Sequence, residues 1–132
     1  LHSKIRNSRK HNIINIVNDI VKDNDIIVSE NLNVKGMSKN HNLAKSIIDA
    51  SFNMICNMLK WKTTIQGKYY YQVDTFYPSS KTCSRCGTKT DITNNLSIRK
   101  WTCENCGNEN DRDINASINI MFEGLKIHYK TI

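Results

Sequence analysis

The sequence has no long hydrophobic run. A membrane-spanning helix needs about 18 or more consecutive apolar residues, and no stretch of this chain reaches that length. Residues 1–12 (LHSKIRNSRKHN) also lack the apolar segment of a signal peptide. Both absences argue against a membrane-bound or secreted protein. We therefore expect an intracellular protein, cytoplasmic or associated with the nucleoid, with no membrane partner.

Acidic residues are scarce as well. The chain has 12 Asp and Glu against 19 Lys and Arg, which gives a net charge of +7. A charge of this sign attracts polyanions over long range, so nucleic acid is the expected partner. The alternative is a basic surface that only keeps a small protein soluble. The four histidines have no partner at metal-ligand spacing, so we assign them no metal; they are His2, His11, His41 and His128.

At 132 residues the chain has room for one domain with a small insert. Apolar residues recur at helical spacing over residues 3–23 and 38–60 and in a closing helix that begins near Asp113, with Gly124 near its end. Short runs around Ile26–Val28 and Lys68–Tyr77 are typical of strands. The residues predicted to lie on these helical faces are Ile13, Ile16, Val17, Ile20 and Val21; Leu43, Ile47, Ile48, Ser51, Met54, Ile55, Met58 and Leu59; and Ile114, Ser117, Ile118, Met121 and Leu125.

Four of the five cysteines form two CxxC pairs. Cys83 and Cys86 are separated from Cys103 and Cys106 by sixteen residues, a spacing typical of a four-cysteine zinc site. Four protein ligands leave no open position for substrate, so we expect a structural zinc. Disulfides are the alternative, but a reducing compartment disfavours them. The fifth cysteine, Cys56, is expected to be a small core residue.

Basic residues flank both cysteine pairs and are candidates for nucleic-acid contact. Trp101 lies among them and is available either to stack on a base or to pack internally. The candidates at this point are Lys81, Arg85, Lys89, Arg99 and Lys100.

Two carboxylates stand at the ends of predicted elements. Glu30 ends the first predicted strand and Asp113 opens the closing helix. Taken singly, Asp113 could be only a helix N-cap, and Glu30 could be a solvent-facing strand end.

The order of four segments changes this interpretation. "IIVSENLNVKGM", "YPSSKTCSRCG", "IRKWTCENCG" and "DRDINASINI" together resemble the C-terminal part of the TnpB family, transposon-encoded RNA-guided DNA nucleases. The resemblance implies a RuvC-like nuclease domain of the RNase H type over residues 1–81 and 109–132, with a zinc ribbon inserted at residues 82–108. It also implies that Glu30 and Asp113 are catalytic and bind magnesium. Asp111 is the less favoured candidate, and Arg112 joins Arg85, Arg99 and Lys100 as a nucleic-acid contact.

The first catalytic motif of the family, a strand bearing an aspartate, is not among these residues. The expected fold is therefore an α/β, partial RNase H-like (RuvC) domain, and the expected activity of this chain alone is little or none. Such a chain could be a fragment, a transposon remnant or a subunit that assembles with another polypeptide. Guide RNA would be bound through upstream parts. The alternative functions are a non-catalytic zinc ribbon that binds DNA or RNA in a regulatory role, and a protein-interaction module.

Overall fold

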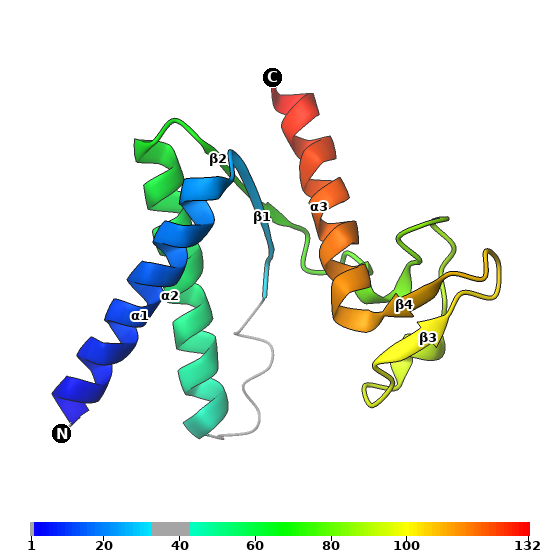
Figure 1. Cartoon of the computed structure of the whole chain (residues 1–132), viewed down its shortest axis with the longest axis horizontal. Coiled ribbons are helices and arrows are strands. Elements are labelled where there is room, and N and C mark those ends of the chain that lie inside the picture. The colour runs from blue at the N-terminus through cyan, green and yellow to red at the C-terminus, as the bar shows by residue number, and fades with distance from the viewer. Residues whose placement is uncertain (1, 33–42) are drawn as a thin grey trace. The chain divides into compact units, whose positions relative to one another are not determined.

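The computed structural model describes residues 2–32 and 43–132. The chain divides into two compact units, and each is described by itself: unit 1 comprises residues 1–27 and 32–71, and unit 2 comprises residues 28–31 and 72–132. Helices and strands alternate in the first half of the chain, and β3 and β4 follow one another before the last helix (Figure 1). The elements are α1 (His2–Asp23), β1 (Ile26–Glu30), α2 (Leu43–Ile65), β2 (Tyr69–Val73), β3 (Lys100–Thr102), β4 (Glu109–Asp111) and α3 (Arg112–Thr131), with short 3-10 helices at Ser79–Lys81 and Ile92–Asn94.

Both sheets are small. β1 pairs with β2, and β3 pairs with β4. The mixed helix and strand content that the sequence predicts is confirmed, whereas an RNase H-like arrangement and the ribbon boundaries at 82 and 108 stay predictions. Among the helices of the described residues, none is both long and apolar enough to cross a bilayer.

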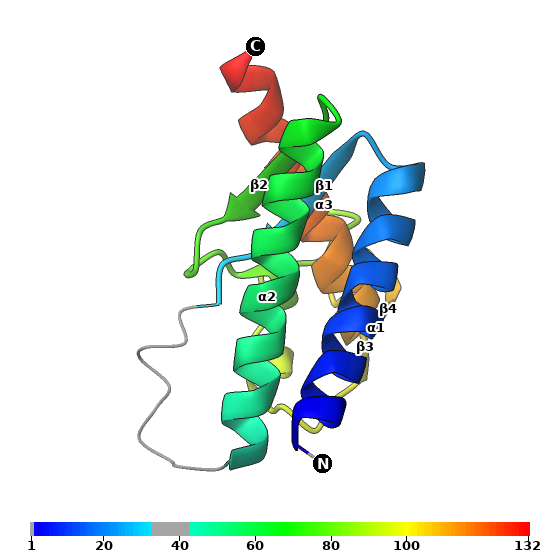
Figure 2. The ribbon, with the colours of Figure 1, turned by 90° about the vertical axis from the view of Figure 1, so that its left-hand side faces the viewer.

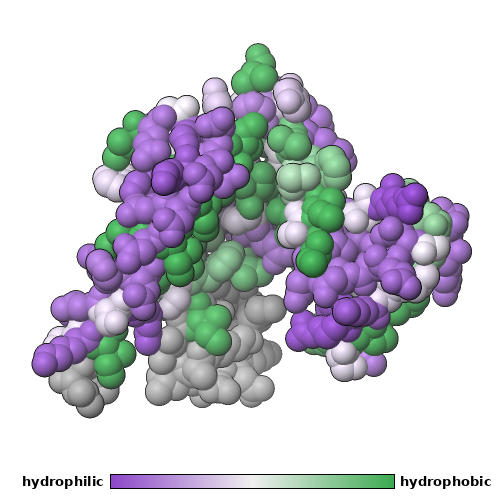
Figure 3. Space-filling view, viewed as in Figure 1, coloured by the Kyte–Doolittle hydropathy of each residue, from purple (hydrophilic) through white to green (hydrophobic). Residues whose placement is uncertain are grey.

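The core of unit 1 lies between two helices. α1 and α2 run side by side in both ribbon views (Figures 1 and 2). Val17 and Val21 are fully buried there with Ile13 and Leu59, because α1 turns one i, i+4, i+8 row toward α2. The outer face of α1 is hydrophilic along most of its length (Figure 3).

The predicted apolar faces of these two helices are partly wrong. Ile16, Ile48 and Met54 are exposed, because only the narrow row that meets the facing helix is covered. Ile20, Ile55 and Met58 pack against the core as predicted, and Cys56 is buried. The predicted start of the second helix at Ser38 lies outside the described residues.

α2 runs beyond its predicted end near Lys60 to Ile65. Gly67 then ends it in a left-handed conformation, with φ of 65°. The Lys68 amide donates to the Thr63 carbonyl at 2.8 Å and the Gly67 amide donates to the Thr64 carbonyl at 3.4 Å, the paired hydrogen bonds of a Schellman cap. The apolar pattern of α2 stops before the helix ends, because the Schellman cap at Gly67 determines where the helix ends.

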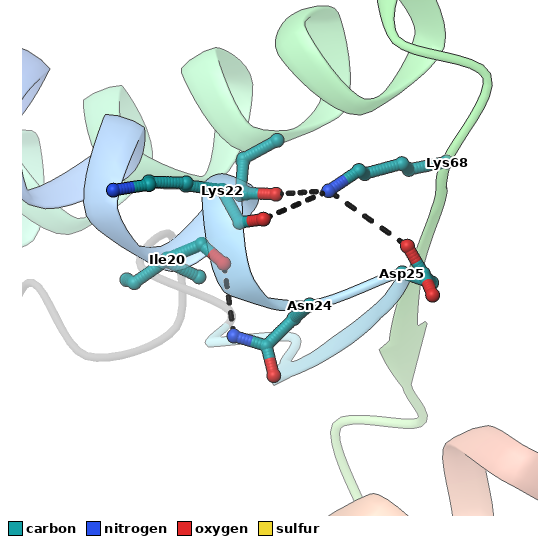
Figure 4. Close-up of polar contacts among 6 residues, drawn as sticks. Ile20, Lys22, Asn24, Asp25 and Lys68 are labelled. Carbon is teal, nitrogen blue, oxygen red and sulfur yellow. Dashed lines mark hydrogen bonds and ion pairs between the residues drawn. The ribbon is translucent and has the colours of Figure 1, made fainter.

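Lys68 also holds the turn between α1 and β1 (Figure 4). Its ammonium donates to the carbonyls of Val21 and Lys22 at the end of α1 and lies 3.8 Å from the Asp25 carboxylate. A cation at this place satisfies carbonyls that have no partner within the helix and complements the helix dipole. One side chain therefore ties the end of α1 to the start of β2.

In unit 2, α3 extends seven residues beyond Gly124 to Thr131, so the expectation that Gly124 lies near its end is wrong. Gly124 instead lies against β1: a Cβ added there would lie 2.8 Å from Val28 Cβ and closer still to both Val28 methyl groups. A glycine is needed here because the backbone of the helix and a branched side chain occupy neighbouring space. The predicted apolar face of α3 is also wrong in part, since Ile114 and Met121 are 61% and 45% exposed. The side chains that this helix buries are polar.

Candidate functional site

The cysteine pairs lie on two turns of the same construction. In each, the first cysteine donates its amide to the carbonyl five residues on at 2.9 Å, and its own carbonyl accepts from the glycine amide four residues on at 2.8 Å. Those glycines, Gly87 and Gly107, have φ of 76° and 69°, a conformation that only glycine adopts without strain. The two turns are therefore built alike.

These turns bring the four sulfurs together. The Sγ atoms of Cys83, Cys86, Cys103 and Cys106 all lie within 4.8 Å of one another. Cys83 Sγ is 3.7 Å from Cys106 Sγ, and Cys86 Sγ is 3.6 Å from Cys103 Sγ. Tetrahedral zinc with Zn–S bonds of about 2.3 Å separates its ligands by about 3.8 Å. The cluster therefore has the donor type and spacing to bind a metal such as zinc, as the sequence predicts.

The surroundings of the sulfurs favour a bound cation. Hydrogen bonding with the side chain and the backbone of Thr88 lowers the pKa of the Cys86 thiol to about 5. A backbone hydrogen bond from Asn108 lowers the pKa of Cys106, but burial and the neighbouring thiols together raise it to about 12. A dication removes this conflict because it stabilises all four thiolates. The buried Asn110 side chain also points its amide at Cys83 Sγ, 3.8 Å away.

Trp101 packs against the cysteine cluster from inside. It is 6% exposed and lies with Cys83 and Cys103 in the small core of the ribbon. Of the two roles that the sequence left open, the structure shows packing. The neighbouring cations face solvent: Lys81, Arg85, Lys89, Arg99 and Lys100 are all exposed, and Arg112 is half-buried.

Two asparagines of α3 clamp the segment that leads into the first cysteine turn. Asn115 Nδ2 donates to the Thr82 carbonyl at 2.8 Å, and Asn115 Oδ1 accepts from the Ser84 amide at 2.8 Å. Asn119 Nδ2 donates to the carbonyls of Ser79 at 2.8 Å and Thr82 at 2.7 Å. Asn115 and Asn119 are 2% and 6% exposed. This asparagine clamp explains why α3 buries a polar face: its neighbour is a row of backbone groups that need partners.

Glu30 meets the same segment. Ser79 Oγ donates to Glu30 Oε1 at 3.3 Å, and Asn119 holds the Ser79 carbonyl. Glu30 is half-buried at the end of β1. Its carboxylate is thus connected to α3 through one serine.

Asp111 and Asp113 have different roles. Asp111 is the N-cap of α3, and its Oδ1 accepts from the amides of Asp113 at 3.1 Å and Ile114 at 3.2 Å. The capping role that the sequence allowed for Asp113 therefore belongs to Asp111. The Asp113 carboxylate is 80% exposed and lies 3.5 Å from the Arg99 guanidinium.

The structure brings together only part of the predicted site. The four cysteines form one cluster, and Arg99 lies beside Asp113. Within residues 2–32 and 43–132, neither Glu30 nor Asp113 belongs to a group of three or more metal-binding side chains, and their meeting around magnesium stays a prediction. The asparagine clamp and Ser79 were missed. The signal for the clamp was the i, i+4 repeat of asparagine in "NASIN".

Comparison with known proteins decides the family. A family model described as the Cas12f1-like TNB domain matches residues 52–120, more than half of the chain. This chain belongs to the Cas12f1-like TNB family. The matched residues include the cysteine cluster, the Asp111 cap, Asp113 and the asparagine clamp. The predicted relation to TnpB-like proteins is confirmed.

Relatives support the assignment. A Streptomyces pristinaespiralis protein whose name marks it as a predicted RNA-guided DNA endonuclease is 36% identical over 125 residues, covering 95% of this chain and 31% of that protein. An Escherichia coli K12 protein with a name of the same kind is 30% identical, covering 94% of this chain and 34% of that protein. The solved structure of Cas12f1 with sgRNA and target DNA matches with a TM-score of 0.63 at 22% identity, over 90% of this chain and 35% of Cas12f1. The chain spans about a third of the length of each.

Proposed function

We propose that this chain is the C-terminal catalytic portion of an RNA-guided DNA endonuclease. The relatives carry this function in their names. The observation that supports particular residues is that Asp111 and Asp113 have different roles at the start of α3. Asp111 caps the helix, so the Asp113 carboxylate stays exposed at the helix N-terminus, where amide groups point outward.

Glu30 and Asp113 are the proposed magnesium ligands. Carboxylate oxygens suit magnesium, and a site made of few carboxylates is completed by water and substrate phosphate. Two bound ions would activate the attacking water and stabilise the leaving oxygen of the phosphodiester. In this chain, Ser79 orients the Glu30 carboxylate, and Arg99 lies where it can bind a phosphate beside Asp113.

The zinc is proposed to be structural. Its four thiolate ligands leave no position for substrate. The ribbon that it would hold carries Arg99 beside Asp113 and Lys100 opposite Asp111. Arg85, Arg99, Lys100 and Arg112 are the proposed contacts to DNA in unit 2. Guide RNA is proposed to bind parts of the full-length enzyme beyond these residues.

Two carboxylates alone hold magnesium poorly, so we propose that the 132-residue chain by itself cleaves little or no DNA. The test is a chimera of the S. pristinaespiralis relative whose matching third is replaced by this chain. We expect RNA-guided, magnesium-dependent cleavage that Glu30→Gln and Asp113→Asn each abolish. Asn57→Asp, an exposed change on α2, is the control and should leave cleavage unchanged. Unchanged cleavage in both carboxylate variants would refute the assignment.

A second candidate is a non-catalytic zinc ribbon that binds DNA or RNA, as a transposon remnant or a regulatory partner of a longer nuclease. It is favoured by the fact that the cysteine cluster is the only group of three or more metal-binding side chains in the described residues. In the chimera experiment it predicts nucleic-acid binding without cleavage, and indifference to both carboxylate variants.

A further inference from the structure

The net positive charge of this chain comes from one unit. Unit 1 has 11 Lys and Arg against 4 Asp and Glu, a net charge of +7, whereas unit 2 has 8 of each and is neutral. The two units together account for the 19 basic and 12 acidic residues of the chain. Unit 2, which contains the ribbon that the sequence singled out for nucleic acid, therefore has no net charge as a whole, although residues 82–108 keep four cations against two acidic residues.

Within unit 1 the charge gathers on the first half of α1. Lys4, Arg6, Arg9 and Lys10 lie within two turns, and the first acidic residue of the chain is Asp19. All four cations are exposed, and none forms an ion pair with a residue that the structure describes. In unit 2, by contrast, Arg99 lies against Asp113. Cations without acidic neighbours keep their full attraction for an external anion.

A shallow hollow of about 620 Å³ lies beside two of these cations. Its lining combines the apolar side chains of Ile5 and Ile13 with the polar residues Lys4, Ser8, Arg9 and Asn12 of α1 and Ser51 of α2. Hydroxyl and amide groups are common partners of phosphate oxygens beside Lys and Arg. The visible face of α1 is hydrophilic over this stretch (Figure 3).

We infer that the first half of α1 is the main nucleic-acid-binding surface of this chain, and that Lys4, Arg6, Arg9 and Lys10 bind the phosphate backbone of a duplex. α1 contains no Phe, Trp or Tyr, so it lacks the stacking platforms that bind single strands. A straight helix holds its charges at fixed spacing, which suits the regular backbone of a duplex. The inference rests on the proposed function, which makes DNA the partner. It adds which surface of the chain supplies most of the affinity for that DNA.

The test compares two neutralised variants of the zinc-loaded chain. One carries Lys4→Gln, Arg6→Gln, Arg9→Gln and Lys10→Gln. The other removes the same charge from the ribbon by Lys81→Gln, Arg85→Gln, Lys89→Gln and Lys100→Gln. Fluorescence anisotropy with a labelled 30-base-pair DNA duplex gives the dissociation constant between 50 and 300 mM salt. Glutamine is a good helix former, and circular dichroism checks that α1 remains folded.

We expect the α1 variant to lose at least about tenfold in affinity at 100 mM salt. Its log–log salt slope should fall by up to about 3.6, from about 0.9 for each phosphate contact. The ribbon variant should lose less than threefold. Equal losses in both variants would show a simple net-charge effect and overturn the inference, as would an unchanged α1 variant or tighter binding of single strands than of duplex.

A charge-conserving variant guards against loss of fold. Lys4→Arg, Arg6→Lys, Arg9→Lys and Lys10→Arg together should keep the wild-type salt slope, and a loss of binding there would contradict a backbone contact. The measurements contain no magnesium, so the proposed magnesium ligands take no part in them as metal ligands. A failure of the catalytic proposal would therefore leave this result intact, and a failure of this inference would leave the cleavage assay of the chimera intact.

Discussion

Gly124→Ala tests the packing of α3 against β1. In an exposed helix this change stabilises, because alanine has a higher helix propensity than glycine by about 1 kcal/mol. Here the new Cβ would lie 2.8 Å from Val28 Cβ and closer to both Val28 methyl groups. Separations below 3 Å between such carbons cannot persist, so β1 or α3 must move.

The sign of the effect depends on which of the two effects is larger. Val28 is β-branched and stiff, and one of the clashing atoms is its Cβ, which cannot move without the strand. Overpacking of this kind costs about 1–3 kcal/mol, which exceeds the gain in helix propensity. We expect a net loss of about 1–2 kcal/mol, which lowers the melting temperature of a unit of this size by roughly 4–16 °C.

The assay follows the thermal unfolding of the zinc-loaded chain by fluorescence of Trp101, which is buried in the ribbon of unit 2. Trp61→Phe removes the signal of the exposed tryptophan in unit 1 and serves as the common background. Ser117→Ala on the exposed side of α3 is the control and should be neutral or slightly stabilising. Adding Val28→Ala to Gly124→Ala should recover part of the loss by removing both methyl groups. A Gly124→Ala protein that melts higher than its background would refute the close approach.

Four further predictions follow from other contacts. Acidification should release the metal, because protons compete with it for the thiolates. The pKa of Cys86 is lowered to about 5 from an ordinary 9.0, so its contribution to stability is fully present above pH 9 and is lost as the pH falls through about 5. Cobalt–thiolate absorption measures the release of the metal, and unchanged absorption at pH 4 would contradict four-thiolate binding. Asn119→Asp should destabilise unit 2 by about 1–3 kcal/mol, because a carboxylate cannot donate to two buried carbonyls. Thermal unfolding followed by Trp101 fluorescence measures this loss, and an equal effect of Asn57→Asp would contradict the clamp. Lys68→Met should destabilise unit 1 by about 1 kcal/mol, because it removes the cation from the end of α1. Urea unfolding followed by Trp61 fluorescence measures this loss, with the exposed change Lys60→Met as control. Equal urea midpoints for the two variants would argue against a capping role of Lys68. Asp111→Ala should cost about 1 kcal/mol through loss of the N-cap, whereas the exposed ion pair makes Asp113→Ala nearly neutral for stability; the reverse order in thermal melts would place the cap at Asp113.

Local patterns predicted what depends on local geometry. The cysteine turns follow from CxxC spacing and the glycines behind them, because a turn of this kind is closed by hydrogen bonds within a few residues. The helices were found for the same reason, since the period of apolar residues is a property of one segment. Even so, the end of α2 was set by the cap at Gly67 rather than by its apolar pattern, and sequence periodicity placed it five residues early.

The burial of α3 depends on a segment that lies far away in the sequence. Its apolar residues suggested the wrong face, because nothing in the helix itself reveals that its neighbour is the backbone of residues 79–84. Asn115 and Asn119 are buried because the backbone carbonyls and amides of that segment need hydrogen-bond partners. Polar residues at i, i+4 on a helix favour solvent unless such a partner is known, so the asparagine clamp could not be inferred from α3 alone.

The charge of the whole chain also has to be divided between its parts. A net +7 and basic residues near the cysteines together suggested a nucleic-acid surface on the ribbon. The division into units shows that acidic residues in unit 2 offset its cations. Net charge is a sum over the chain, and its effect on a partner depends on where the uncompensated part lies.

The relation between the ribbon and Asp113 follows from strand register. β3 pairs with β4 so that Lys100 lies opposite Asp111, and the Arg112 amide donates to the Arg99 carbonyl at 2.8 Å. Asp111, the last residue of β4, is therefore also the N-cap of α3. Arg99 and Lys100, at the start of β3, lie beside the first turn of that helix. Cys103 follows β3 directly and Cys106 lies three residues before β4, so a metal bound by them would close the loop that holds this register. A bound zinc would thus fix the direction in which α3 starts, and with it the position of the Asp113 carboxylate, without sharing any ligand with the ion that this carboxylate is proposed to bind.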